Sequence, residues 1–190
     1  RIKEIKMVKK IIIDTDPGVD DSLAIFVALN SPELDVLGLT TVFGNATTST
    51  CTENALRLLE IAKRTDIPVA EGAHLPLNGN LRGAASFVHG ENGQGNVELK
   101  PPTNKTLEID AVAFLKNQIE VHPNEITLVP VGPLTNIANL LTTHPGIDSK
   151  IKEIILMGGN AQSPGNATPT AEANILNDPE AADIVFSAQC

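Results

Sequence analysis

Four aspartates crowd into eight residues directly after the apolar run Ile11-Ile12-Ile13, in the segment I-I-I-D-T-D-P-G-V-D-D. The apolar run is typical of a buried parallel strand, and the Pro-Gly pair ends that strand. The carboxylates therefore stand at the C-terminal end of a strand, where open α/β sheets bind their ligands. This feature predicts an α/β fold with a functional site at the first strand.

Carboxylates at this density repel one another unless a cation or shared protons offset the repulsion. An all-oxygen cluster favours a hard cation such as Ca²⁺ or Mg²⁺ over zinc. A purely structural role explains two of the four aspartates. Asp20 is a reasonable helix N-cap, and Asp21 suits the first turn of a helix, where the helix dipole is positive. It does not explain Asp14 and Asp16 at the end of a buried strand, so we prefer the metal-site interpretation.

Apolar runs alternate with helical patterns along the chain. The predicted strands are 10–14, 35–43, 126–131 and 153–157, with a weaker one at 67–70. The predicted helices are 20–30, 50–64, 108–121, 133–142 and 179–188. This order predicts βαβ units, and hence an open, mostly parallel sheet with helices on both faces. The segment 71–106 is rich in Gly, Asn and Pro, and a loop of that length is more often functional than idle.

The chain of 190 residues is long enough for one α/β domain spanning residues 1–190, with residues 1–6 as a possible extension before Met7. A formal charge of -9 argues against nucleic acid as a partner. No apolar run is long enough to cross a bilayer and no signal peptide is visible, so we expect no membrane partner.

Only two cysteines occur, which does not support a disulfide framework. Two glycosylation sequons fall in loops that we expect to form the site, at Asn45 and Asn166, and a glycan there would block it. We therefore expect a reducing, cytoplasmic location.

Each strong strand is followed by small and polar residues, and in a parallel sheet these ends lie along one edge. Asn45 follows the second strand, and the segment Val131-Gly132-Pro133 follows the fourth. The loop after the last strand carries Asn166, Glu172 and Asn174, whose donors and acceptors suit sugar hydroxyls; the alternative is that they simply form turns. His89 lies on the long loop, among glycines that allow close backbone approach.

These segments resemble the inosine–uridine nucleoside hydrolases over nearly the whole chain and in the right order. The matching segments are 14–21, 40–45, 89–93, 130–136, 157–159, 165–174 and 177–182. The resemblance implies hydrolysis of the N-glycosidic bond of ribonucleosides of the inosine or uridine type, giving ribose and a free base.

The resemblance also assigns roles to individual residues. It implies one Ca²⁺ held by Asp16, Asp21 and the backbone carbonyl of Val131, with Asp16 as the base that deprotonates the attacking water. Asp14 would support the ligands around it. The residues that the resemblance places near the substrate are Asp20, Asn166, Glu172 and Asn174 at the ribose hydroxyls, Asn45 close to the ribose, and His89 near the base.

Members of this family are usually dimers or tetramers, so the resemblance implies a homo-oligomer. Their chains are longer, and an aspartate that completes the calcium shell lies beyond the point that matches Cys190. We therefore expect weak or no activity from this 190-residue polypeptide alone. The choice between purine and pyrimidine bases stays open.

Two other functions compete with the hydrolase. A haloacid dehalogenase-type phosphatase also opens with a strand and an Asp-x-Asp pair that binds Mg²⁺, but that family has Thr or Val where Gly18 stands, and it leaves Asp20 and Asp21 unexplained. A calcium-dependent nucleoside-binding module without catalysis would use the same residues as the hydrolase. The sequence does not separate this last reading from catalysis.

Overall fold

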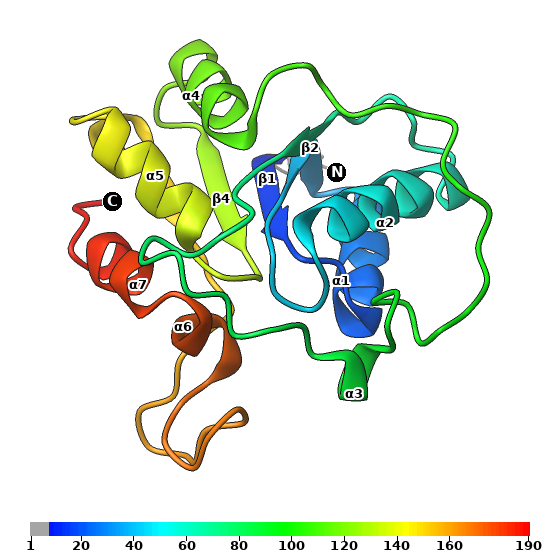
Figure 1. The fold of residues 1–190 in the computed structure, drawn as a ribbon. Coiled ribbons are helices and arrows are strands. Elements are labelled where there is room, and N and C mark those ends of the chain that lie inside the picture. The colour runs from blue at the N-terminus through cyan, green and yellow to red at the C-terminus, as the bar shows by residue number, and fades with distance from the viewer. Residues whose placement is uncertain (1–7) are drawn as a thin grey trace, which may run out of the picture.

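The computed structural model describes residues 8–190, so the expected extension at residues 1–6 lies outside the described part. Its centre is a five-stranded sheet with the order β3-β2-β1-β4-β5, in which every pair of neighbours is parallel (Figure 1). The strands are β1 (Lys9–Thr15), β2 (Leu34–Thr41), β3 (Val69–Glu71), β4 (Ile126–Pro130) and β5 (Glu153–Ile154). The prediction of an open, parallel sheet is confirmed.

Helices follow the strands and cover both faces of the sheet. They are α1 (Val19–Leu29), α2 (Thr48–Ile61), α3 (Ser86–His89), α4 (Ala111–Val121), α5 (Thr135–Thr143), α6 (Ala173–Asn177) and α7 (Pro179–Phe186), with a 3₁₀ turn at Asp148–Lys150. Figure 1 shows α1 and α2 on one side of the sheet and α4, α5 and α7 on the other. No helix in residues 8–190 is long and apolar enough to cross a membrane.

The isoleucine run of β1 supplies both halves of the core, because successive side chains of a strand point to opposite faces. Ile11 and Ile13 pack in one buried cluster with Ile25 of α1 and residues of α2. Ile12 is fully buried in a second cluster formed by α4, α5 and α7. A strand buried on both faces needs an unbroken apolar run, which is the pattern that predicted it.

The sheet places the acidic segment at the centre of its carboxyl edge. Asp14 pairs with Thr40 of β2 on one side and with Pro130 of β4 on the other. Backbone bonding continues past the ends of these strands, since the Val42 amide donates to the Thr15 carbonyl and the Val131 amide donates to the Asp14 carbonyl. The segments that follow β1, β2 and β4 therefore meet at one place.

Two short helices, α3 and α6, were not predicted. Each is a single turn, and a single turn is too short to show the 3.6-residue periodicity on which a helix prediction rests. The regular part of β5 is also shorter than the predicted strand 153–157. Ile155 and Met157 nevertheless donate backbone hydrogen bonds to Leu128 and Pro130, so the extended path continues.

Candidate active site

Asp16 directly follows β1 at the carboxyl edge of the sheet and is 2% exposed. Its Oδ2 accepts a hydrogen bond of 2.7 Å from the Asn45 backbone amide. Its Oδ1 is buried and has no hydrogen-bond partner within residues 8–190. A side chain at Gly44, whose φ is +153°, would collide with this carboxylate. The glycine at position 44 thus lets the backbone after β2 close onto Asp16.

Asp14 is buried directly beneath this site. Its Oδ1 accepts hydrogen bonds from Thr40 Oγ1 at 2.5 Å and from Asn136 Nδ2 at 2.7 Å. Its Oδ2 is the other buried side-chain oxygen without a partner in the described part of the chain. Asp14 is therefore only partly satisfied, which is costly for a buried carboxylate and calls for an explanation.

Asp21 occupies the first turn of α1 and closes the turn that precedes it. Its Oδ2 accepts from the Gly18 amide at 3.0 Å and from Asn45 Nδ2 at 2.9 Å. The N-cap of α1 is Gly18, so the alternative that Asp20 caps this helix is wrong. Asp21, three residues after Gly18, takes the capping role instead. Asn45 joins the two carboxylates, because its side chain holds Asp21 while its backbone holds Asp16.

The electrostatics of this cluster favour a positive charge. Burial raises the pKa of Asp14 to about 6, against the opposing effect of the hydrogen bonds from Thr40 and Asn136. Burial also raises the pKa of Asp21 to about 6. The pKa of Asp16 lies well above its usual range, first because of burial and next because of repulsion from Asp21. Protons or a cation would relieve all three shifts.

The donor set fits a hard cation such as Ca²⁺. All the candidate atoms are oxygens, and the buried Oδ1 of Asp16 is left free to bind one. The backbone after β4 runs tightly against it, since a Cβ at Gly132 would stand 2.6 Å from that oxygen. Residues 8–190 contain no group of three or more His, Cys, Asp or Glu side chains able to hold a metal. Other oxygens, such as the Val131 carbonyl, would therefore have to join Asp16 and Asp21.

Asp20 and His89 lie at the mouth of the site. The Asp20 side chain is 78% exposed, and its Oδ1 is 3.8 Å from His89 Nδ1. The same nitrogen accepts a hydrogen bond of 3.3 Å from the Val19 amide. His89 belongs to α3, so these contacts tie the long loop to the start of α1.

The segment 159–177 supplies the opposite side of the site. Asn166 is exposed, and its Oδ1 accepts from the Ala173 amide at 2.9 Å. Asn174 is half-buried, and its Nδ2 donates to the Val131 carbonyl at 2.9 Å. Asn174 thus touches the carbonyl that was predicted as a calcium ligand, and a carbonyl has a second lone pair for another partner.

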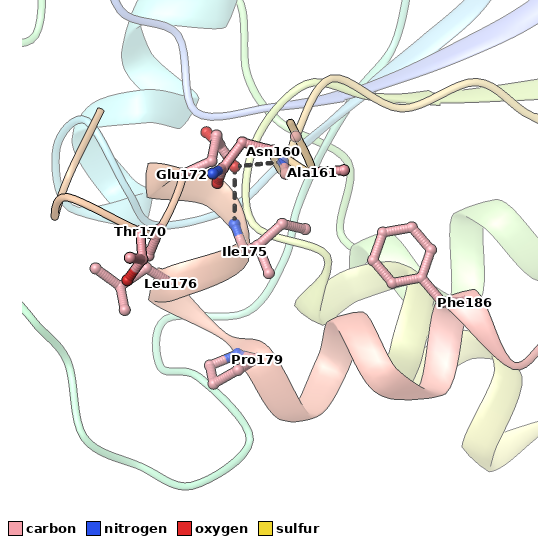
Figure 2. Close-up of a pocket in the computed structure, with 11 residues that line it drawn as sticks. Asn160, Ala161, Thr170, Glu172, Ile175, Leu176, Pro179 and Phe186 are labelled. Atoms are coloured by element: carbon pink, nitrogen blue, oxygen red, sulfur yellow. Dashed lines mark hydrogen bonds between the residues drawn. The ribbon is translucent and has the colours of Figure 1, made fainter. Parts of the chain in front are cut away.

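Glu172 differs from its neighbours because both of its carboxylate oxygens bind backbone amides. Oε1 accepts from Asn174, and Oε2 accepts from Ile175 at 3.1 Å and from Gly159 at 2.8 Å. Figure 2 shows the carboxylate turned onto the start of α6, beside a cavity of about 600 Å³ that Phe186 also lines. The role of Glu172 at the ribose stays a prediction.

A larger cavity of about 810 Å³ brings most of the predicted substrate residues together. Those that line it are Asp20, Asn45, His89, Asn166 and Asn174. They come from the segments after β1 and β2, from the long loop and from the segment 159–177. The convergence expected from a parallel sheet is therefore present for these side chains.

Asn136, a residue that sequence reasoning gave no role, supports this site from α5. It is fully buried, its Nδ2 donates to Asp14 and to the Thr41 carbonyl, and its Oδ1 accepts from the Ala73 amide at 2.8 Å. One side chain thus joins the first carboxylate, the end of β2 and the start of the long loop. The available signal was a polar residue after the end of a buried strand, in the segment Pro133-Leu134-Thr135-Asn136.

Comparison with known proteins agrees with this geometry. The chain is 52% identical to uridine nucleosidase 1 of Arabidopsis thaliana over 180 residues, which are 95% of this chain and 54% of that protein. It is 48% identical to the pyrimidine-specific ribonucleoside hydrolase RihA of Shewanella sp. (strain MR-7), over 96% of this chain and 57% of that protein. The chain thus spans about half the length of these curated relatives.

Solved structures give the same result. A plant nucleoside hydrolase, the PpNRh1 enzyme, superposes with a TM-score of 0.92 at 51% identity, over 94% of this chain and 57% of that one. A purine-preferring ribonucleoside hydrolase from Gardnerella vaginalis superposes with a TM-score of 0.90 at 38% identity, also over 94% of this chain and 57% of that one. The model of one family, the inosine-uridine preferring nucleoside hydrolases, matches residues 11–190. The chain belongs to the inosine-uridine preferring nucleoside hydrolase family.

Proposed function

We propose that this chain serves the hydrolysis of the N-glycosidic bond of ribonucleosides to ribose and a free base. The observation that carries the proposal is the buried Oδ1 of Asp16, which has no partner within residues 8–190 and lies at the carboxyl edge of the sheet. An isolated structural carboxylate would be satisfied by neighbouring donors. A buried oxygen left free in a member of this family is suited to bind a ligand or to accept a proton.

Asp16 and Asp21, with the carbonyl of Val131, would hold the Ca²⁺ ion that the family resemblance implies. When bound, the ion supplies positive charge that offsets the two carboxylates and acidifies a water near them. The support for this assignment is the all-oxygen donor set and the raised pKa of both carboxyls.

Asp16 is the proposed general base for the attack of water on the anomeric carbon. The Asn45 amide holds Oδ2, so the carboxylate is fixed in one orientation, in which it would take the proton from a water beside the ion. As the glycosidic bond to the nucleobase breaks, the sugar gains oxocarbenium character, which nearby carboxylates stabilise. A positioned base of this kind contributes roughly 10²- to 10⁴-fold to the rate.

The ribose would lie in the cavity of about 810 Å³, where several side chains reach its hydroxyls. The proposed ribose contacts are Asp20, Asn45, Asn166 and Asn174, with Glu172 from the start of α6. His89, on the other wall, would stand near the base. The first substrate to test is uridine, because a curated relative at 52% identity is named a uridine nucleosidase. Assembly as a dimer or tetramer and a cytoplasmic location are proposals that rest on the family resemblance and on cysteine and sequon usage.

The test is the release of ribose from uridine and inosine by the purified protein, with added Ca²⁺ and with a chelator, in parallel with Asp16→Asn. We expect calcium-dependent release that Asp16→Asn removes, weak from the 190-residue chain alone and stronger from a form extended at the C-terminus to the length of its relatives. If neither the chelator nor the Asp16→Asn substitution lowered the rate of ribose release, the assigned site would be refuted. Calcium-dependent binding of uridine in calorimetry without any release would instead support a nucleoside-binding module.

A further inference from the structure

The Asp-Pro-Gly turn between β1 and α1 is held by two side-chain amides from distant parts of the chain. Pro17 has no backbone N–H, so its carbonyl is its only backbone hydrogen-bonding group. That carbonyl accepts hydrogen bonds from Gln94 Nε2 at 3.1 Å and from Asn54 Nδ2 at 3.3 Å. The turn connects Asp16 to Asp21, so the contacts that fix it also fix the spacing of the two proposed calcium ligands.

Gln94 reaches the turn from the long loop and is half-buried. Its Nε2 also donates to Ser22 Oγ at 3.0 Å, and the buried Ser22 hydroxyl donates to the Gly18 carbonyl at 2.6 Å. Its own backbone amide donates to Asn92 Oδ1 at 2.9 Å. Gln94 therefore joins the loop to both carbonyls that lead into α1.

Asn54 reaches the turn from α2 and is fully buried. Its Nδ2 also donates to the Asn92 carbonyl at 2.9 Å, and its Oδ1 accepts from Arg57 Nη1 at 2.7 Å. Because a guanidinium can only donate, the bond from Arg57 fixes the orientation of this amide. Gly93, with a φ of +71°, lets the loop approach, since a Cβ there would stand 3.0 Å from Asn54 Nδ2. Loop, helix and turn thus meet in one group of hydrogen bonds.

We propose that Gln94 is a positioning residue, which holds the acidic turn in the geometry that binds Ca²⁺ and so couples calcium affinity to the docking of the long loop. This inference rests on the proposed function and adds a supporting residue to it. Among residues 8–190, neither Gln94 nor Asn54 lines the cavity of about 810 Å³, so Gln94 acts through the turn and not on the substrate. By linkage, if the docked loop favours calcium binding, bound calcium favours the docked loop to the same degree.

The first test measures Ca²⁺ affinity by calorimetry in Gln94→Met, which keeps the length of the side chain and removes its hydrogen bonds. We expect roughly tenfold weaker binding, as for other residues that support metal ligands without touching the metal. The matched control is Asn96→Gly, which removes the acceptor of the Glu91 amide in the same loop and suits the φ of +59° at that position. Asn96→Gly should change the affinity less than about twofold.

The second test measures hydrogen exchange of the loop amides of Glu91 and Gln94, with saturating Ca²⁺ and with a chelator. The reference is the Ala113 amide at the start of α4, which Asp110 caps. In the unmodified protein Ca²⁺ should slow exchange of the loop amides more than that of Ala113. In Gln94→Met the slowing should be equal at all three amides, because the loop no longer senses the turn. A purely structural role for Gln94 would leave the extra slowing of the loop amides in place.

The outcomes separate this inference from the proposed function. If Gln94→Met binds Ca²⁺ as tightly as the unmodified protein, or if Asn96→Gly loses as much affinity, the positioning role is wrong and the calcium site stands. If the unmodified protein binds no Ca²⁺, even when extended at the C-terminus to the length of its relatives, the proposed calcium site falls and the positioning role falls with it.

Discussion

On the β1 side of the cleft the carboxylates of Asp14, Asp16 and Asp21 are buried, and Asp14 and Asp16 each keep one oxygen without a hydrogen-bond partner within residues 8–190. On the opposite side, Asn166 is exposed and Asn174 half-buried. The carboxylates receive hydrogen bonds from distant segments, such as the one from Asn136 across 122 positions. The polar groups of 159–177 bind mostly within their own segment, as Asn166 does with Ala173.

This difference separates two ways of building a site. The β1 side keeps buried charge that a cation can neutralise, which costs stability in the absence of that cation. The segment 159–177 satisfies its own backbone and presents amides to the cleft at little cost. Substitutions should therefore affect stability and activity in opposite directions on the β1 side, and only weakly on the other side.

The largest effect is expected from Asp16→Asn. We predict a loss of kcat of about 10³-fold or more in ribose release, because the proposed base is gone. The same variant should unfold at a higher temperature than the unmodified protein when calcium is chelated, since a repelled, buried charge has been removed.

The matched control for that prediction is Asp178→Asn. Asp178 is also fully buried, but it accepts hydrogen bonds from Leu77, Thr135 and Ala181. Its substitution should lower the melting temperature, because satisfied contacts are lost. If the melting temperature fell for both variants, the Asp16 carboxylate would have to be hydrogen-bonded as completely as the Asp178 carboxylate.

The next effect concerns the pH dependence of stability. The pKa of Asp14 is about 6 in the folded protein and would be near 3.8 when unfolded. Because the folded pKa is raised, the bound proton stabilises the fold below about pH 4, and that contribution is lost as the pH rises through about 6. We predict that, in chelator, the free energy of unfolding is lower near pH 7.5 than near pH 5, by roughly 1 to 2 kcal/mol from Asp14.

Urea denaturation at the two pH values measures this difference, and Asp14→Asn should flatten it. Added Ca²⁺ should restore more stability near pH 7.5 than near pH 5, because the carboxylates are then charged. Equal stability at both pH values in the unmodified protein would mean that Asp14 titrates normally and that its burial is compensated.

The sequence predicted the β1 side well, because the signal there is local. An apolar run that ends in Asp-Pro-Gly specifies a strand, a break and a helix within a few residues. The meeting of Asp16, Asn45 and Val131 then follows from parallel topology, since the carboxyl ends of all strands lie along one edge.

The supporting contacts were not predictable in the same way. The Asn136 side chain takes its partners from three separate segments, and no spacing in the sequence encodes that choice. Glu172 was expected among sugar ligands, yet its oxygens bind the amides at the start of α6. The first backbone amides of a helix have no acceptor within the helix, so they can bind a nearby carboxylate in place of a ligand. Only the tertiary structure shows whether a given carboxylate binds these amides.

On the opposite side of the cleft we predict a smaller effect from Asn174→Ala. The lost side chain would cost about one hydrogen bond to the sugar, so KM for uridine should rise roughly tenfold with kcat nearly unchanged. Steady-state kinetics with saturating Ca²⁺ measure this split. A fall in kcat at constant KM would instead assign Asn174 to the transition state, through the Val131 carbonyl that it contacts.

The smallest effect is expected from Glu172→Gln, and it decides between two roles for this residue. Glutamine keeps one acceptor oxygen but turns an NH₂ group toward the amides of Ile175 and Gly159, so we predict a loss of about 1 kcal/mol in the free energy of unfolding. The control is Asp110→Asn, which alters the cap of α4, where Asp110 accepts from Ala113. If Glu172 only caps α6, the two variants should lose similar stability and keep KM within about threefold. If Glu172 also binds ribose, KM should rise at least as much as in Asn174→Ala while Asp110→Asn leaves it unchanged.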